Sequence, residues 1–198
     1  PALGYSTYFL YTNGNENPFI KTINKPSSLI ATENTLENNK VKIAFDENGN
    51  IIEYYIKDYN YNIACEGFGK AIIINDEKSD TWAHGIFRFD DEIGFFHSPE
   101  FSIVENGPVR ITLKVKKYYN HSSLIQYYSL TEDSDTLSVR VKLNCQEKYK
   151  IIKLSFPCNI QNPKGLYSMP FGYINKEGTK KNIRTNDNKI DYSIIIFI

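Results

Sequence analysis

The sequence has little cysteine, and its three cysteines lie far apart. Cys65, Cys145 and Cys158 are an odd number and include no Cys-x-x-Cys pair. A disulfide framework needs an even set of cysteines, and a structural zinc site needs ligands paired at short spacing. The pattern argues against both, and we expect buried thiols in a reducing compartment, the cytoplasm.

An excess of charge is also lacking. Lys and Arg together number 23, Asp and Glu together number 23, and the formal net charge is zero. A neutral chain argues against nucleic acid or an anionic membrane as the main partner. The sequence also shows no signal peptide and no apolar run of membrane-spanning length, so no membrane partner is expected.

Helix-forming residues are scarce, whereas strand-forming residues are abundant. Ala occurs six times, and no segment has a convincing amphipathic helical period. Ile, Val, Thr and the aromatic residues account for 71 of the 198 residues, and these types favour strands. The chain begins at Pro1 and its single Met is Met169, so we expect it to be cut or processed from something longer.

Turn signals divide the strand-forming segments at intervals of about ten residues, which is typical of an antiparallel sandwich or barrel. Asn48-Gly49 lies between two apolar runs and predicts a hairpin. Residues 109–116 alternate apolar and polar side chains, as in a half-buried strand. Residues 76–100 read as an irregular loop. The predicted strands cover residues 5–12, 40–45, 51–56, 70–75, 101–104, 109–116, 124–130, 137–145 and 151–156.

A row of cationic residues alternates with apolar ones on these predicted strands. The row consists of Arg110, Lys114, Lys116, Arg140 and Lys142. A solvated sheet face needs polar residues at period two, and nearby acids balance the charge. We therefore interpret the row as a solvated face and not as an anion-binding one.

The loop over residues 76–100 contains the best candidate site. His84 and His97 flank the acidic group 90–92, and Asp80 precedes them. The spacing matches no familiar metal-ligand pattern, so solvated acids are the simpler interpretation. Trp82, the only Trp, could stack on a sugar ring or pack in an interface.

Several catalytic patterns are absent from the sequence. No Gly-x-Ser-x-Gly, phosphate-binding loop or Gly-x-Gly-x-x-Gly occurs. Asp90 and Asp91 are adjacent, so in a strand they would point to opposite sides. A glycosidase needs two carboxyl groups facing one substrate, and this pair is therefore poor evidence for catalysis.

Five motifs occur in order along the chain and cover most of residues 1–174. They are Pro1–Tyr5, Glu37–Gly49, Ser79–His84, Val104–Arg110 and Met169–Gly172. Together they resemble the C-terminal region of α-mannosidases of glycoside hydrolase family 38, and the resemblance fades after Gly172.

This resemblance implies an all-β fold, an antiparallel β-sandwich of the galactose mutarotase-like super-sandwich type. Residues 1–28 would be a strand and linker from a preceding small β region, and residues 29–198 a sandwich truncated at its C-terminus. In the family, retaining α-mannoside hydrolysis takes place in an N-terminal barrel. The Asp nucleophile, the acid/base and a divalent metal, usually zinc, lie in that barrel, so the resemblance assigns no catalytic or metal residue and no cofactor to this chain.

Three functions remain open at this stage. The first is a non-catalytic sandwich domain that supports the barrel and contacts α-mannoside-type carbohydrate through Trp82, His84 and Asp80. The second is a mutarotase- or epimerase-like enzyme that uses a His and a carboxylate as acid and base. The third is a carbohydrate-binding module. The acid–base candidates for the second are His84 or His97 with Glu92 or Glu100.

The chain ends in an apolar, strand-forming segment over residues 193–198. Such a terminus needs a pairing partner. It could be a strand of the sandwich, a dimer contact, or the product of a truncated reading frame, and we favour truncation.

Overall fold

The computed structural model describes residues 5, 7, 27–78, 80, 82, 84–85, 89–160, 164–177 and 190–197. Apart from residues 5 and 7, the strand predicted over residues 5–12 lies outside these residues, as does most of the strand-and-linker region predicted over residues 1–28. The domain boundary at residue 28 therefore stays a prediction.

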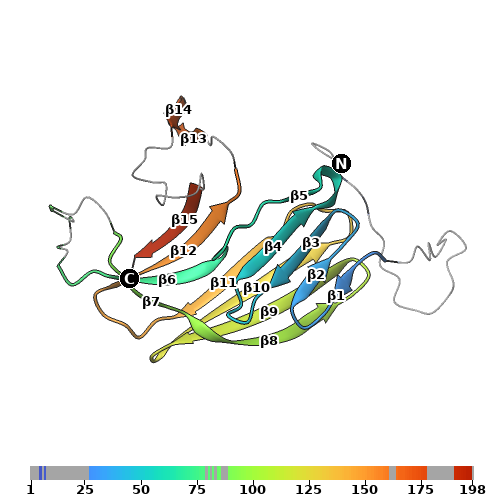
Figure 1. Ribbon diagram of the computed structural model, residues 1–198, viewed down its shortest axis with the longest axis horizontal. Coiled ribbons are helices and arrows are strands. Elements are labelled where there is room, and N and C mark those ends of the chain that lie inside the picture. The colour runs from blue at the N-terminus through green and yellow to red at the C-terminus, as the bar shows by residue number, and fades with distance from the viewer. Residues whose placement is uncertain are drawn as a thin grey trace, which may run out of the picture.

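The described strands form three larger sheets and one separate hairpin (Figure 1). The first sheet has the strand order β1-β2-β3-β4-β5, and every neighbouring pair is antiparallel. A short 3₁₀ turn, Lys57–Tyr59, separates its last two strands. The strands of this first sheet are β1 Ile30–Ala31, β2 Thr35–Glu37, β3 Val41–Phe45, β4 Ile51–Ile56 and β5 Tyr61–Asn62.

The predicted hairpin between β3 and β4 is confirmed. The Asp46 carboxylate accepts hydrogen bonds from the backbone N–H groups of Asn48 and Asn50, at 2.9 and 2.7 Å. Gly49 has φ +70°, a conformation that glycine adopts without steric strain. The Asp46 carboxylate therefore stabilises the turn through hydrogen bonds to the turn's own backbone.

The second sheet, which we call the long sheet, has the order β11-β10-β9-β8, with antiparallel pairing throughout. The predicted alternation is confirmed within β9, since Ile111, Leu113 and Val115 are fully buried while Arg110 is exposed, but Val109 precedes the strand and is exposed instead of buried. The cationic row of the sequence lies on the outward face. The strands of the long sheet are β8 His97–Asn106, β9 Arg110–Tyr119, β10 Ser122–Thr131 and β11 Ser138–Asn144.

The third sheet has the order β15-β12-β6-β7. The apolar segment at the chain end is a strand of the sandwich here, because β15 pairs with β12 over eight residue pairs. The strands of this sheet are β15 Ile190–Phe197, β12 Lys150–Cys158, β6 Lys70–Asn75 and β7 Glu92–Phe95.

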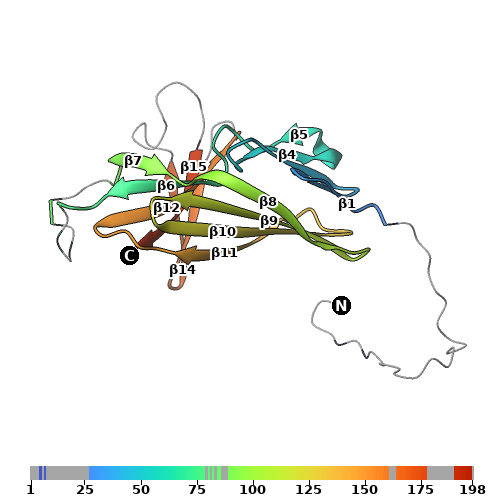
Figure 2. The same ribbon diagram turned by 90° about the horizontal axis from the view of Figure 1, so that it is seen from below.

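The first and third sheets both pack on the inner face of the long sheet (Figure 2). One core cluster joins residues of the first sheet, such as Ile43 and Phe45, to Leu113 and Tyr128 of the long sheet. A second cluster joins β6 and β12 to Leu124. These layers confirm the all-β, antiparallel sandwich that the sequence predicts.

Two local predictions are wrong. Residues 76–100 are not irregular throughout, since β7 and the start of β8 lie within them. The strand predicted over residues 151–156 does not end before Pro157, because β12 runs from Lys150 to Cys158. The ladder with β6 ends at Ser155, so the missing N–H of proline breaks no bond there, and the Pro157 carbonyl accepts one from Cys65.

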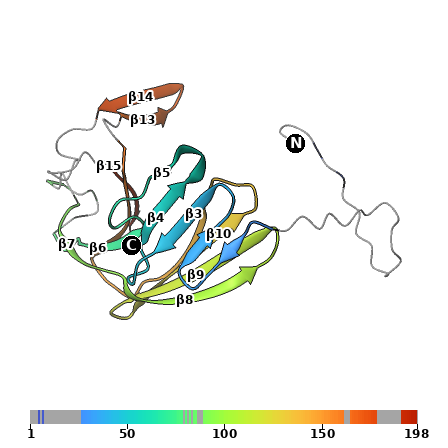
Figure 3. The same cartoon turned by 45° about the vertical axis from the view of Figure 1, so that its right-hand side comes forward.

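The hairpin of β13, Lys164–Met169, and β14, Gly172–Glu177, stands apart from the long sheet and the first sheet (Figure 3). Its apolar side chains are exposed, and Phe171 is fully exposed.

The three cysteines form no disulfide with one another, but only Cys158 is buried. The expectation of three buried thiols is therefore wrong for the half-buried Cys65 and Cys145. Within the described ranges, no helix has the length and apolarity to cross a membrane.

Candidate functional site

The three residues predicted as a carbohydrate rim lie together on an exposed turn. Asp80 organises the turn, since its Oδ1 accepts hydrogen bonds from the backbone N–H groups of Trp82 and His84, both at 3.0 Å. Its Oδ2 lies 2.6 Å from His84 Nδ1. Trp82 is 80% exposed, so the turn presents an aromatic ring beside an imidazole–carboxylate pair.

The residues named as acid–base candidates for a mutarotase-like enzyme form hydrogen bonds with other residues. The imidazole of His84 bonds to Asp80, and His97 Nδ1 lies 2.8 Å from Ser98 Oγ. Glu100 accepts a hydrogen bond from the Tyr118 hydroxyl at 2.6 Å. The described hydrogen bonds of His84 and His97 therefore join them to Asp80 and Ser98 and not to Glu100. Among the residues that the structure describes, no three His, Cys, Asp or Glu side chains gather in a metal-binding arrangement.

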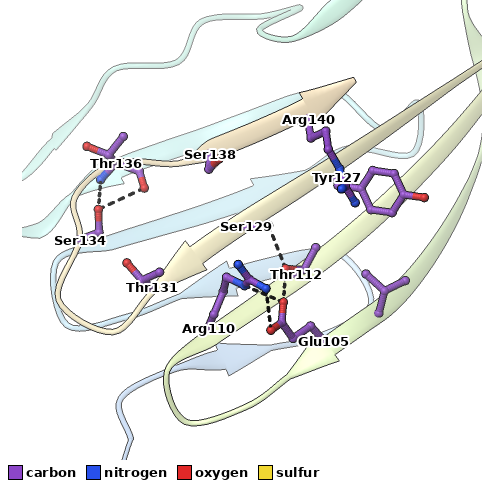
Figure 4. A pocket seen from close by; sticks show the side chains of 11 residues that line it. Glu105, Arg110, Thr112, Tyr127, Ser129, Thr131, Ser134, Thr136, Ser138 and Arg140 are labelled. Atoms are coloured by element: carbon purple, nitrogen blue, oxygen red, sulfur yellow. Dashed lines mark hydrogen bonds and ion pairs between the residues drawn. The ribbon is translucent and has the colours of Figure 1, made fainter. Parts of the chain in front are cut away.

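A hollow that the sequence did not reveal crosses the outward face of the long sheet (Figure 4). We call it the groove, and its volume is about 880 Å³. All four strands of the long sheet contribute to it, together with the turn between β10 and β11. The lining residues are Val104, Glu105, Arg110, Thr112, Tyr127, Ser129, Thr131, Ser134, Thr136, Ser138 and Arg140.

Cross-strand register aligns one polar row across the floor of the groove. Glu105 lies opposite Thr112, Thr112 opposite Ser129, and Ser129 opposite Ser138. The Thr112 hydroxyl is 3.0 Å from Glu105 Oε2 and 2.9 Å from the Ser129 hydroxyl. Outward positions of adjacent antiparallel strands lie close enough for such contacts, so the row is a continuous hydrogen-bonded chain over three strands.

An ion pair lies at one end of this row. Arg110 donates to both carboxylate oxygens of Glu105, at 2.7 and 3.0 Å. The hydrogen bonds from Arg110, and then that from Thr112, lower the pKa of Glu105. Glu105 is therefore ionised at neutral pH and already accepts three hydrogen bonds, which suits it to binding and not to proton donation.

At the other end of the groove, Arg140 packs over Tyr127. The Arg140 guanidinium carbon lies 4.5 Å from the centre of the Tyr127 ring, and Lys142 Nζ lies 5.6 Å from it. Figure 4 shows the Arg140 side chain reaching to the ring from the neighbouring strand. This cation–π contact holds the guanidinium group over the Tyr127 ring.

The turn between β10 and β11, which forms one wall of the groove, is held by hydrogen bonds from side chains of the first sheet and its connections. Asn38 is 1% exposed, and its side-chain nitrogen donates to the carbonyls of Thr131 and Ser134, at 2.8 and 2.7 Å. The Tyr54 hydroxyl donates to the Asp135 carbonyl at 2.9 Å and accepts from the Leu137 N–H at 3.1 Å. The wall is therefore held by side chains of the opposite layer.

The groove is thus a fixed surface of donors, acceptors and one aromatic ring. Seven of its eleven lining residues carry a hydroxyl group. The outward cationic row predicted as a solvated face lies here in part, through Arg110 and Arg140. The signal in the sequence was the run of Ser and Thr at outward positions, but it indicates a hollow only once the register between strands is known.

Comparison with known protein families gives a match that covers most of the sandwich. No curated protein matches the chain at a significant level. The family model described as the glycosyl hydrolases family 38 C-terminal domain matches residues 36–191, a span that runs from β2 into β15 and includes both the Trp82 turn and the groove. The chain therefore belongs to the family of glycosyl hydrolases family 38 C-terminal domains.

Proposed function

We propose that this chain is the non-catalytic sandwich domain of an α-mannosidase-like glycoside hydrolase and that it supports the catalytic barrel. The observation that carries the proposal is the family match over residues 36–191, a span that runs from β2 into β15 and takes in most of the three packed sheets. The one carboxylate in the groove, Glu105, is held ionised by Arg110, which fits a binding role better than an acid–base role.

The domain also contacts carbohydrate of the α-mannoside class through the exposed turn of Trp82, His84 and Asp80. The exposure of Trp82 supports this, because an accessible aromatic face can pack on the apolar face of a sugar ring. The Asp80 carboxylate keeps the turn in shape through its two backbone bonds. We assign the protein to the cytoplasm, in accord with three cysteines that form no disulfide with one another.

The test is an assay of the purified 198-residue chain with an aryl α-mannoside, with and without added zinc. We expect no release of the aryl group above the buffer blank. Turnover that is abolished by a point change within this chain would show that it carries its own catalytic site and would overturn the proposal.

Two further measurements separate the other functions. Acceleration of the anomer exchange of free mannose would replace the proposal with a mutarotase-like activity, and a His84→Gln variant would then test the imidazole as its acid or base. Mannoside binding without turnover that is lost in Trp82→Ala would support sugar contact at the exposed turn. A Tyr59→Ala variant is the control, since Tyr59 is equally exposed at 80% and lies in the 3₁₀ turn.

A further inference from the structure

We infer that the groove on the outward face of the long sheet is a binding site for a neutral oligosaccharide, separate from the Trp82 turn. The inference rests on the proposed function for the sugar class, because it takes α-mannosides as the first ligands to test. Its evidence is the chemistry of the groove.

The lining of the groove is rich in groups that both donate and accept hydrogen bonds. Seven of the eleven side chains bear hydroxyl groups, and a hydroxyl both donates and accepts hydrogen bonds. A sugar chain presents the same mixed pattern along its length. Cores of protein–protein interfaces are instead apolar and aromatic, and a nucleic acid requires a strong positive field, which a chain of zero net charge does not supply.

Hydrogen bonds within the protein already hold the side chains and the wall of the groove in place. The Thr112 hydroxyl forms hydrogen bonds with Glu105 and Ser129, and Arg110 donates two hydrogen bonds to the Glu105 carboxylate. The turn that carries Ser134 is held by buried Asn38. Side chains and loops that are fixed before binding lose little conformational entropy when a ligand arrives.

The Arg140–Tyr127 pair places hydrogen-bond donors at one end of the groove. A guanidinium carries five N–H donors, and the guanidinium carbon of Arg140 lies 4.5 Å from the centre of the Tyr127 ring. Arg140 is exposed, so these donors are accessible to the hydroxyl oxygens of a sugar. Tyr127 acts here as the support that orients Arg140.

The size of the groove is consistent with this occupant. Its volume of about 880 Å³ lies within the range of roughly 300–1,000 Å³ seen for small-molecule sites. Because it crosses all four strands of the long sheet, the groove is extended, and this suits a short linear glycan better than a single sugar.

The experiment is a calorimetric titration of the full chain with α-linked mannotriose, supported by amide shift changes in NMR spectra. We expect millimolar or tighter binding and at least tenfold weaker binding for Arg140→Ala and Tyr127→Ala. Arg140→Lys keeps the charge but loses the planar fork, and we expect it to bind weakly as well. Tyr59→Ala, an exposed aromatic outside the groove, serves as the matched control and should bind as the wild type does.

Circular dichroism of each variant shows whether the sheet remains folded, so a loss of binding can be assigned to the groove. Shift changes that follow β9 to β11 support the inference. Binding that is lost in Trp82→Ala but unchanged in Arg140→Ala would overturn it, as would binding of a uronic acid trimer with none of mannotriose. Absence of any mannotriose binding would also overturn it, whereas the proposal of a non-catalytic domain is decided by the assays of aryl α-mannoside turnover and anomer exchange.

Discussion

The Asn38 side chain donates a hydrogen bond to the Ser134 carbonyl at 2.7 Å, although the two residues lie 96 positions apart. Asn38 belongs to the connection between β2 and β3 of the first sheet, and Ser134 to the turn that forms one wall of the groove. The same amide also accepts hydrogen bonds from the backbone N–H groups of Lys40 and Val41, both at 2.8 Å. One buried side chain thus joins the two layers of the sandwich next to the candidate binding site.

Replacement of Asn38 by Ala should lower the free energy of unfolding by about 3 kcal/mol. The change removes the hydrogen bonds of a buried side chain to four backbone groups, of which the Val41 N–H is buried and the other three are partly buried, and each lost bond costs about 1 kcal/mol. Urea denaturation followed by circular dichroism measures the loss, because the single Trp is exposed and reports poorly on the core.

Two variants make this test specific. Asn38→Asp keeps the acceptor for Lys40 and Val41 but turns a carboxylate oxygen toward two carbonyls, so it should be at least as destabilising as Ala. Asn39→Ala changes an exposed neighbour and should stay within about 0.5 kcal/mol of the wild type. Equal stability of Asn38→Ala and Asn39→Ala would contradict the role of Asn38.

A buried lysine gives the sandwich a distinctive pH dependence. Lys117 is fully buried, and its Nζ donates to Asn50 Oδ1 at 3.3 Å. Burial lowers the pKa of Lys117 from 10.5 to about 8, and the charge of Asp46 opposes that shift. Between pH 8 and 10.5 the folded protein has lost this proton while the unfolded chain still holds it.

Stability should therefore rise with pH from 8 toward 10, by about 2 kcal/mol from this group. Above pH 10 the trend should reverse, because burial raises the pKa of Tyr54 and Tyr128 and the unfolded chain then loses the tyrosine protons first. Urea midpoints at pH 7 to 10 measure the rise. In Lys117→Met the rise should be absent, and an unchanged slope in that variant would contradict the assignment.

The strand pattern of the long sheet could be predicted because period-two alternation is a local property. Residues 109–116 alternate in the sequence, and the structure buries Ile111, Leu113 and Val115 as that pattern requires. The same alternation continues to Lys117, where it turns a cation toward the core. A period-two pattern predicts which face of a strand is buried, but it does not predict that a polar residue such as Lys117 will be buried there.

The groove could not be predicted, because it depends on register between strands. The polar row forms only when Glu105, Thr112, Ser129 and Ser138 are aligned, and a shift of one residue would turn a strand's side chains to the opposite face. A register irregularity between Ile103 and Glu105 sets the first of these positions. Irregularities of this kind in β8, one of which lies between His97 and Glu100, also weaken its period-two pattern.

Gly49 is a point where turn geometry and core packing coincide. A Cβ at this position would lie 2.8 Å from Val115 Cγ1 and 3.1 Å from Pro99 Cβ, and φ is +70°. Gly49→Ala should therefore destabilise the fold by about 3 kcal/mol, from left-handed backbone strain and overpacking together.

Gly85 separates the two contributions, since it has φ +74° and a Cβ added there would meet no atom within 4 Å. Gly85→Ala should cost only about 1 kcal/mol, the strain alone. Chemical denaturation of both variants under identical conditions provides the comparison. Equal losses would mean that the contact with Val115 relaxes without cost.

The two phenylalanines Phe45 and Phe171 offer the sharpest contrast between the packed sandwich and the projecting hairpin. Phe45 is 2% exposed, and its ring centre lies 4.8 Å from that of Tyr128 and 6.2 Å from that of Phe101. Phe45→Ala should lower the free energy of unfolding by about 4 kcal/mol, because it removes a buried ring and leaves a cavity between the first sheet and the long sheet. Phe171→Ala, at a fully exposed site, should change it by less than about 0.5 kcal/mol. A loss above about 2 kcal/mol for Phe171→Ala would show that the hairpin packs against the sandwich in solution.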